Sequence, residues 1–187
     1  MAENLSFAQE VTNLMYSPHG SSLNTCLQCG TCSGSCPAVE FMDQTPRRLI
    51  GMINADLKED ALATNTAWAC ASCYHCTVRC PAKIDIAGVM YAVKRYAMQH
   101  KTYSEDLVNP TFYRAFKKTV DVNGRSYEPL LAPSYIFNLG VKGFFLEVQG
   151  ATKLMLKGRI PVLPSRIKDQ KKFQRMIKTI PTKEELL

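Results

Sequence analysis

The sequence predicts an all-α protein in which two cysteine-rich loops lie between helices. Three observations lead to this prediction. Apolar residues recur at helical spacing in several segments, as in residues 86–97, where positions 86, 89, 90, 93 and 97 are apolar. Residue types that begin helices stand directly before two such segments, with Thr45 before Pro46 and Asp85 before Ile86. Strand signals are scarce along the whole chain.

The first half of the chain contains four expected helices. Residues 5–16 place an apolar face on one side, made of Leu5, Ala8, Val11, Leu14 and Met15. A second helix starts after Thr45 and carries an apolar stripe of Leu49, Ile50, Ile53 and Leu57. A third helix is expected over residues 58–69, and a fourth begins after Asp85.

The residues after Cys80, more than half of the chain, contain no cysteine and are expected to be helical as well. A helix opens at Asn109-Pro110 and runs to about Val120, before a turn at Asn123-Gly124. Residues 134–156 are typical of one or two apolar helices, and residues 169–179 of a basic helix.

All eight cysteines lie in two blocks that have the same spacing. The first block holds Cys26, Cys29, Cys32 and Cys36, and the second repeats it 44 residues later as Cys70, Cys73, Cys76 and Cys80. Each block ends in Cys-Pro-Ala. The spacing Cys-x2-Cys-x2-Cys-x3-Cys-Pro is that of bacterial ferredoxins that hold two [4Fe–4S] clusters. In those proteins the fourth cysteine of each block ligates the other cluster.

The spacing therefore predicts two crossed ligand sets. One cluster takes Cys26, Cys29, Cys32 and Cys80, and the other takes Cys70, Cys73, Cys76 and Cys36. Because Gly30 and Gly34 have no side chains, the amides of the first loop are accessible and can donate hydrogen bonds to cluster sulfurs. We expect residues 1–105 to form a two-cluster core of the α-helical ferredoxin type. Residues 106–187 are expected to form a helical C-terminal extension that docks partners.

Other uses of clustered cysteines fit the sequence less well. Zinc ribbons use two separated Cys-x2-Cys pairs, whereas here four cysteines crowd into eleven residues, twice. Secreted disulfide scaffolds usually spread their cysteines through the fold. With eight thiolates committed, His75 is expected to be a polar neighbour or an exposed residue and not a ligand. Trp68, Tyr74 and Tyr91 are expected to pack and to exclude water. Arg79, Lys83 and Lys94 are expected to lie on a solvated face.

No catalytic constellation is visible in the sequence. It has neither a Gly-x-Gly-x-x-Gly motif nor a Walker loop, and no cysteine is left over as a nucleophile. His19, His75 and His100 form no visible acid–base group. The net charge of +7 comes from basic residues scattered through helices and concentrated in residues 153–183. This distribution favours a solvated face or contact with acidic partners, and no nucleic acid.

The sequence indicates neither a secretory leader nor a transmembrane segment. Residues 1–5 lack a basic stretch followed by an apolar core. No run of about 18 uncharged apolar residues occurs. Residues 135–156 come nearest, but Lys142, Glu147 and Lys153 interrupt them. We therefore expect a cytoplasmic protein, with this segment as the candidate for peripheral membrane contact.

With its flanking residues, the chain resembles the C subunit of the heterodisulfide reductase family, including the C subunits of bacterial heterodisulfide-reductase-like complexes. The likeness rests on residues 24–37 (NTCLQCGTCSGSCP), 45–48 (TPRR) and 68–81 (WACASCYHCTVRCP), and on the tail at 156–161 (LKGRIP). The cysteine motif alone is shared by many ferredoxin-like proteins, so the flanks and the tail make the resemblance specific.

The resemblance implies a non-catalytic electron-transfer subunit of an oxidoreductase complex. In that family, the C subunit relays electrons between two other subunits, in disulfide and sulfur metabolism. The A subunit contains flavin, whereas the B subunit has cysteine-rich CCG motifs. This chain has no adjacent pair of cysteines, so it does not supply the CCG-type site itself. Two alternatives stay open: a stand-alone dicluster ferredoxin, and the iron–sulfur subunit of a membrane-associated quinone-linked oxidoreductase.

Overall fold

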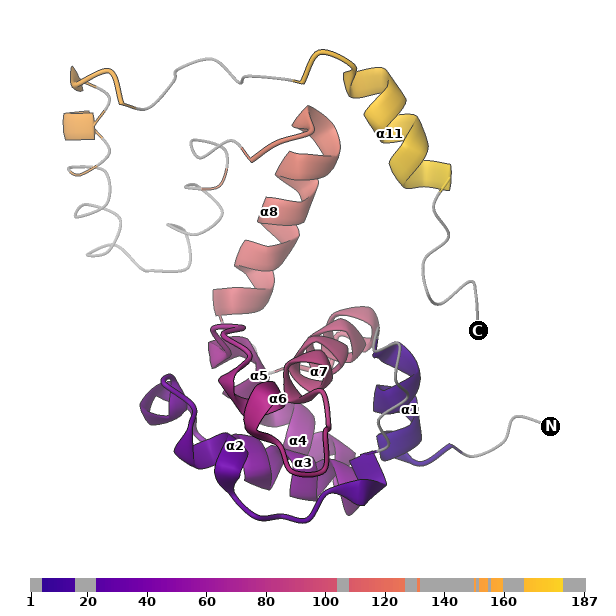
Figure 1. Cartoon of the computed structure of the whole chain (residues 1–187). Helices are drawn as coiled ribbons and strands as arrows, with labels where there is room; N and C mark the ends of the chain where they lie inside the picture. The colour runs from indigo at the N-terminus through magenta and orange to yellow at the C-terminus, as the bar shows by residue number, and fades with distance from the viewer. Residues whose placement is uncertain are drawn as a thin grey trace. The chain divides into compact units, whose positions relative to one another are not determined.

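The computed structural model describes residues 5–15, 23–103, 108–126, 131, 150, 152–154, 156–159 and 167–179. Within these ranges every regular element is a helix and none is a strand (Figure 1). The predicted all-α class is therefore confirmed. The chain divides into two compact units, Met1–Asp106 and Leu107–Leu187. The cysteine blocks lie in the first unit.

The first unit is built from short helices around one long helix, α7. Its elements in order are α1 (Phe7–Leu14), η1 (Leu23–Thr25), α2 (Thr31–Gly34), η2 (Val39–Phe41), α3 (Pro46–Asn54), α4 (Lys58–Ala63), α5 (Thr66–Ala69), α6 (His75–Arg79) and α7 (Ile86–His100). Helix α7 contacts α1, α5 and α6, while α3 contacts α1, α2 and α4. The two short helices that follow the cysteine loops, α2 and α6, contact each other.

Side-chain caps fix where three helices of this unit begin. Ser6 and Gln9 form a reciprocal capping box at the start of α1. The Thr45 side chain accepts a hydrogen bond from the Arg48 N–H, and Pro46 occupies the first turn of α3. The Asp85 side chain accepts from the Gly88 N–H at the start of α7. The helix starts predicted at Thr45 and Asp85 are confirmed.

The core of the first unit is formed by apolar faces that the sequence pattern indicates. Val11, Leu49, Ile50, Ile53 and Val89 are completely buried. Together they come from α1, α3 and α7, the helices whose apolar residues recur at helical spacing. Burial of such side chains contributes roughly 1.5–3 kcal/mol each. The cysteine loops are therefore attached to a core that has its own apolar packing.

Two residues assigned to apolar faces from the sequence lie outside them. Leu5 and Leu57 are each 47% exposed. Leu5 precedes the Ser6 cap, and α3 ends at Asn54, three residues before Leu57. The turn after α3 places Asp56 at a φ of 59°, where its carboxylate accepts a hydrogen bond of 2.7 Å from the Phe7 N–H. Those two assignments are wrong because the helices are shorter than the apolar pattern suggests.

The single helix predicted over residues 58–69 is also wrong, because the chain breaks between α4 and α5. Thr64 is extended, with a ψ of 151°. Asp43 and Asn65 then fix the start of α5 through two hydrogen bonds to each other. The Asn65 N–H donates to Asp43 Oδ2, and the Asp43 N–H donates to Asn65 Oδ1, both at 2.9 Å. Contacts from a distant loop override the local helix preference.

In the second unit, the structure gives the bounds of helices α8 (Val108–Asn123) and α11 (Gln170–Thr179), and residues 152–154 are helical as well. Helix α8 ends at the predicted turn, where Gly124 has a φ of 76°. The Gln174 amide of α11 donates to the Val122 carbonyl at the end of α8, 3.1 Å away. The basic helix expected over residues 169–179 is confirmed as α11. Helix α8 is longer at both ends than the sequence indicates.

The apolar segment expected over residues 134–156 lies mostly outside the described residues. Across the part of the chain that the structure describes, no helix has both the length and the apolar character needed to cross a membrane.

Candidate iron–sulfur centres

The two cysteine blocks fold in the same way. In each, two cysteines lie in an extended loop, the third lies in a short helix, and the fourth follows that helix. Cys32 is in α2 and Cys76 is in α6. The residues before these helices, Gly30 and Tyr74, both have left-handed backbone conformations. The repeat in the sequence is therefore a repeat of backbone path.

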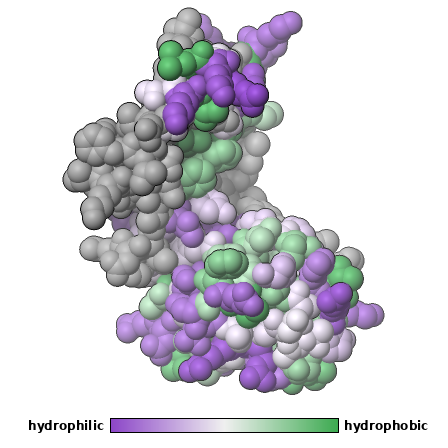
Figure 2. All heavy atoms as spheres, turned by 90° about the vertical axis from the view of Figure 1, so that its left-hand side faces the viewer, coloured by the Kyte–Doolittle hydropathy of each residue, from purple (hydrophilic) through white to green (hydrophobic). Residues whose placement is uncertain are grey.

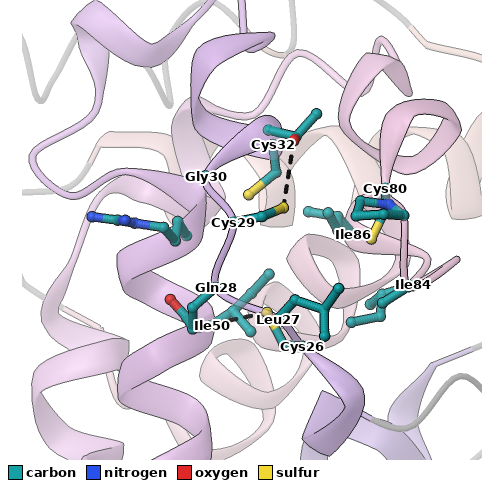
Figure 3. A pocket seen from close by; sticks show the side chains of 14 residues that line it. Cys26, Leu27, Gln28, Cys29, Gly30, Cys32, Ile50, Cys80, Ile84 and Ile86 are labelled. Atoms are coloured by element: carbon teal, nitrogen blue, oxygen red, sulfur yellow. Dashed lines mark hydrogen bonds between the residues drawn. The ribbon is translucent and has the colours of Figure 1, made fainter.

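The first hollow is lined by Cys26, Cys29 and Cys32 of the first block and by Cys80 of the second. It encloses about 350 Å³ of space that opens to solvent. Figure 3 shows the four cysteines around this shared space, with Ile84 and Ile86 beside Cys80. Cysteines from two blocks that are far apart in the sequence thus face one hollow.

The second hollow repeats this arrangement with the blocks exchanged. Cys70, Cys73 and Cys76 of the second block line it together with Cys36 of the first. Its space is about 380 Å³. In each hollow, the fourth cysteine comes from the other block, as in two-cluster ferredoxins. The structure brings together both sets of four cysteines that the sequence singled out.

The donor sets and the space fit [4Fe–4S] clusters. Each hollow offers four thiols arranged around a space that is open to solvent, and cysteine thiolates are the ligands of such clusters. Among the described residues, no group of three or more His, Cys, Asp or Glu side chains is gathered closely enough to hold a single metal ion. The thiols surround a space and do not converge on one point.

Several thiols interact with neighbouring donors. In the first set, Gln28 Nε2 donates to Cys26 Sγ at 3.5 Å, and the Thr31 hydroxyl lies 3.4 Å from Cys29 Sγ. In the second set, the Ser72 N–H donates to Cys70 Sγ at 3.4 Å. Hydrogen bonds to ligand sulfurs stabilise the reduced cluster and raise its potential. The donors are mostly side chains in the first loop and a backbone amide in the second.

Burial and hydrogen bonding act in opposite directions on the free thiols. Burial raises the pKa of Cys32, Cys36 and Cys76. The hydrogen bond from Thr31 lowers the pKa of the exposed Cys29. A partly buried thiolate is unfavourable without a nearby positive charge, which iron supplies when it binds.

The walls of the two hollows differ in polarity. Gln28, Thr31 and Arg47 line the first, whereas Met42 and Met90 line the second. Sequence reasoning missed Arg47 as a wall residue, because α3 brings it from outside the cysteine blocks. Its backbone N–H donates to the Ser33 hydroxyl at 3.0 Å, which joins the start of α3 to α2.

Most of the neighbours considered from the sequence lie away from the hollows. His75 is exposed on α6 and lines neither hollow. Trp68 is buried and packs edge-to-face on Tyr103 at 6.1 Å, as expected of a packing residue. Arg79 and Lys83 are exposed, but Lys94 is buried, with its ammonium 5.8 Å from the centre of the Tyr91 ring. The solvated position predicted for Lys94 is therefore wrong.

Both hollows reach the protein surface. One cysteine of each set, Cys29 and Cys73, is exposed. Large apolar side chains near the cysteine loops are exposed as well, among them Leu27, Phe41 and Val78. Figure 2 shows hydrophobic residues lying among hydrophilic ones on the face of the first unit that it presents. A redox partner can therefore approach the cysteine loops closely.

Comparison with known proteins identifies the cysteine region. Residues 22–84 match the family model of the 4Fe–4S dicluster domain. The C subunit of the H(2):CoB-CoM heterodisulfide,ferredoxin reductase of Methanothermobacter marburgensis is 40% identical over 78 residues, which cover 42% of each chain. The C subunit of the Ferredoxin:CoB-CoM heterodisulfide reductase of Methanosarcina acetivorans is 26% identical over 122 residues, covering 65% of this chain and 48% of the relative.

A protein of Archaeoglobus profundus that is named as similar to the heterodisulfide reductase C subunit is 29% identical over 94 residues, half of each chain. The matches thus span no more than half the length of these curated relatives. They confirm the resemblance to the heterodisulfide reductase C subunit. The chain contains a 4Fe–4S dicluster domain, carries two [4Fe–4S] clusters and is similar to heterodisulfide reductase C subunits.

Proposed function

We propose that this chain relays electrons through its two clusters between two other members of a cytoplasmic heterodisulfide-reductase-like complex, in disulfide or sulfur metabolism. One partner is a flavoprotein, and the other is a protein with CCG domains. The observation that carries the proposal is the pair of four-cysteine hollows in a chain similar to heterodisulfide reductase C subunits. When bound, the clusters supply one-electron transfer. The chain's residues hold them, set their surroundings and offer surfaces to partners.

We further propose that the two hollows hold the clusters through the crossed ligand sets. Cys26, Cys29, Cys32 and Cys80 would hold one cluster, and Cys70, Cys73, Cys76 and Cys36 the other. The lining of each hollow supports this assignment, because each holds three cysteines of one block and the fourth of the other. Crossing would tie the two sites together, since each block contributes to both.

A relay needs two points of contact, and the exposed Cys29 and Cys73 belong to different hollows. One partner could therefore approach each site at a separate cysteine. We assign the second unit, from about residue 106 onward, to partner docking. Its helix α11 supports this role with the exposed basic residues Lys171, Lys172, Arg175 and Lys178, which suit an acidic surface.

Native co-purification tests the relay. The chain should be isolated under anaerobic, non-denaturing conditions from its own cells, and the accompanying proteins identified by mass spectrometry. Recovery of a flavoprotein together with a protein that carries CCG motifs is expected. A lone monomer that exchanges electrons would instead indicate a stand-alone dicluster ferredoxin. Recovery from the membrane fraction with a quinone-reactive protein would indicate the membrane-associated alternative.

Replacement of single fourth cysteines tests the ligand sets. Cys36→Ser should destabilise the cluster that Cys70, Cys73 and Cys76 hold, so that iron falls from about eight to about four atoms per chain. Alkylation followed by mass spectrometry should then label those three cysteines. Cys80→Ser is the matched control and should free Cys26, Cys29 and Cys32. If each variant freed the cysteines of its own block, the crossed assignment would be wrong.

A further inference from the structure

The two cysteine loops follow the same backbone path, but the position that is glycine in the first loop is tyrosine in the second. Gln28 and Gly30 have φ angles of 52° and 83°, and the equivalent Ser72 and Tyr74 have φ angles of 54° and 61°. Glycine adopts a positive φ without strain because it has no Cβ, whereas for a bulky aromatic residue this conformation is an outlier. The second loop thus holds a strained tyrosine where the first has glycine.

Tyr74 both lines the second hollow and faces solvent. It lines the hollow together with Cys70 and Cys73, yet 48% of its surface is exposed. At the first hollow, a Cβ placed on Gly30 would lie 3.7 Å from Cδ of Arg47. The side chain that covers the glycine of the first loop therefore comes from another helix, whereas in the second loop the corresponding residue supplies the cover itself.

A second tyrosine, Tyr91 of α7, holds the loop that carries Tyr74. The Tyr91 hydroxyl donates to Ser72 Oγ at 2.8 Å, and the Ser72 N–H donates to Cys70 Sγ at 3.4 Å. A line of hydrogen bonds therefore runs from Tyr91 through the loop of Tyr74 to a cysteine of the hollow. Strained backbone persists where the surrounding structure holds it, and it gathers at functional sites.

We propose that Tyr74, supported by Tyr91, shields the second four-cysteine site from water and dissolved solutes, and that its strained conformation serves this shielding. The inference rests on the proposed ligand sets and is independent of the partner proteins. Solvent access influences the potential and the lability of an iron–sulfur cluster. A cover of this kind would slow the loss of the second cluster without contributing a ligand.

The rate of iron loss from the cluster-loaded protein tests the shield. Tyr74→Gly and Tyr74→Ala should be incubated anaerobically with excess EDTA while the visible absorption of the clusters and the released iron are followed. In both variants about half of the iron should leave several-fold faster than in the unchanged protein, because only one of two equal clusters is uncovered. The other half should leave at the unchanged rate.

Two control variants show whether faster iron loss is due to removal of the Tyr74 ring or to substitution in general. Tyr74→Phe keeps the aromatic ring and should retain the slow rate. Phe41→Ala removes an aromatic residue that is 74% exposed and lines neither hollow, so its rates should not change. Rapid iron loss from Phe41→Ala, or unchanged rates in both Tyr74→Gly and Tyr74→Ala, would overturn the proposal.

A comparison of glycine with alanine tests the strain. Both variants remove the ring, but only glycine relieves the positive φ. In chemical denaturation, Tyr74→Gly should therefore unfold at a higher denaturant concentration than Tyr74→Ala, although both lose iron equally fast. A lower midpoint for glycine would show that residue 74 is not strained, contrary to the proposal.

Alkylation after the fast phase identifies the uncovered site. The labelled cysteines should be Cys36, Cys70, Cys73 and Cys76. Labelling of Cys26, Cys29, Cys32 and Cys80 would overturn the shield, because Tyr74 would then cover the other cluster. Labelling of Cys80 in place of Cys36 would instead overturn the crossed ligand sets on which the proposal rests.

Discussion

At the scale of the residue, the two hollows differ most clearly in charge. Arg47 lines the first hollow, whereas the second has no Asp, Glu, Lys or Arg among its lining residues within the described part of the chain. A nearby cation stabilises the reduced form of a cluster, which carries one more negative charge. We therefore expect Arg47 to raise the reduction potential of the first site.

Arg47→Gln should lower the potential of one cluster and leave the other unchanged. The shift should be on the order of tens of millivolts, because a partly exposed charge acts through solvent with about 1 kcal/mol or less. Redox titration followed by electron paramagnetic resonance measures both potentials.

Arg48→Gln serves as the matched control, since Arg48 is also exposed on α3 but lines neither hollow. Equal shifts from the two substitutions would mean that general surface charge, and not the position of Arg47, sets the potential. Raising the ionic strength should shrink the Arg47 effect, because exposed charges are screened.

At the scale of the element, distant contacts hold helices that are too short to be stable alone. Helices α2 and α6 have four and five residues. Isolated helices of this length do not persist in water, because nucleation is costly. Arg47 joins α3 to α2 through Ser33, and the Thr77 hydroxyl of α6 accepts a hydrogen bond of 3.0 Å from the Ala87 N–H at the start of α7. Each of these short helices is thus attached by a hydrogen bond to a longer helix.

The hydrogen bonds between Asp43 and Asn65 are expected to stabilise the first unit. Asp43→Ala should destabilise the first unit by about 1–2 kcal/mol, because the Asn65 N–H and the Thr66 hydroxyl lose an acceptor. Denaturant unfolding at equilibrium measures the change.

Glu40→Ala is the control for this substitution. Glu40 is exposed in η2, close to Asp43 in the sequence, and its removal should change stability by less than about 0.5 kcal/mol. An equal effect of the two substitutions would show that the pair does not secure the break between α4 and α5.

At the scale of the whole molecule, the apolar core and the cysteine loops are separate sources of stability. Many core side chains come from α1, α3 and α7, whereas the cysteine loops surround hollows that open to solvent and touch this core only along one wall, at residues such as Ile50 and Met90. Binding of metal to such loops contributes directly to their folding. Loss of the clusters should therefore affect the loops far more than the core.

Removal of iron by anaerobic chelation tests this division. Amides in residues 26–36 and 70–80 should lose their protection from hydrogen exchange, whereas those of α7 should keep most of theirs. Hydrogen exchange with mass spectrometry, before and after chelation, follows both regions. If α7 lost protection together with the loops, the core would depend on the clusters and the separation would not hold.

Local patterns accounted for much of the fold and of the candidate site. Helices begin at Thr45 and Asp85 because the side-chain oxygen of each accepts a hydrogen bond from an otherwise unpaired backbone N–H. Such a cap involves only residues that are neighbours in the sequence, so the sequence predicts it. The break at Thr64 was not predictable in this way, because its cause is Asp43, in another loop. Arg47 was missed for the same reason.

The sequence alone predicts which residues carry the chemistry, because two blocks of identical spacing allow few uses for eight cysteines. The same spacing predicted that Cys80 joins Cys26 and that Cys36 joins Cys70, and the structure lines its two hollows in this way. The side chains that complete the walls of the hollows could be known only from the packed fold. Arg47 lines one hollow and a strained Tyr74 the other, although the two loops share one backbone path. Equal motifs therefore acquire unequal surroundings, because side chains from elsewhere in the fold complete them.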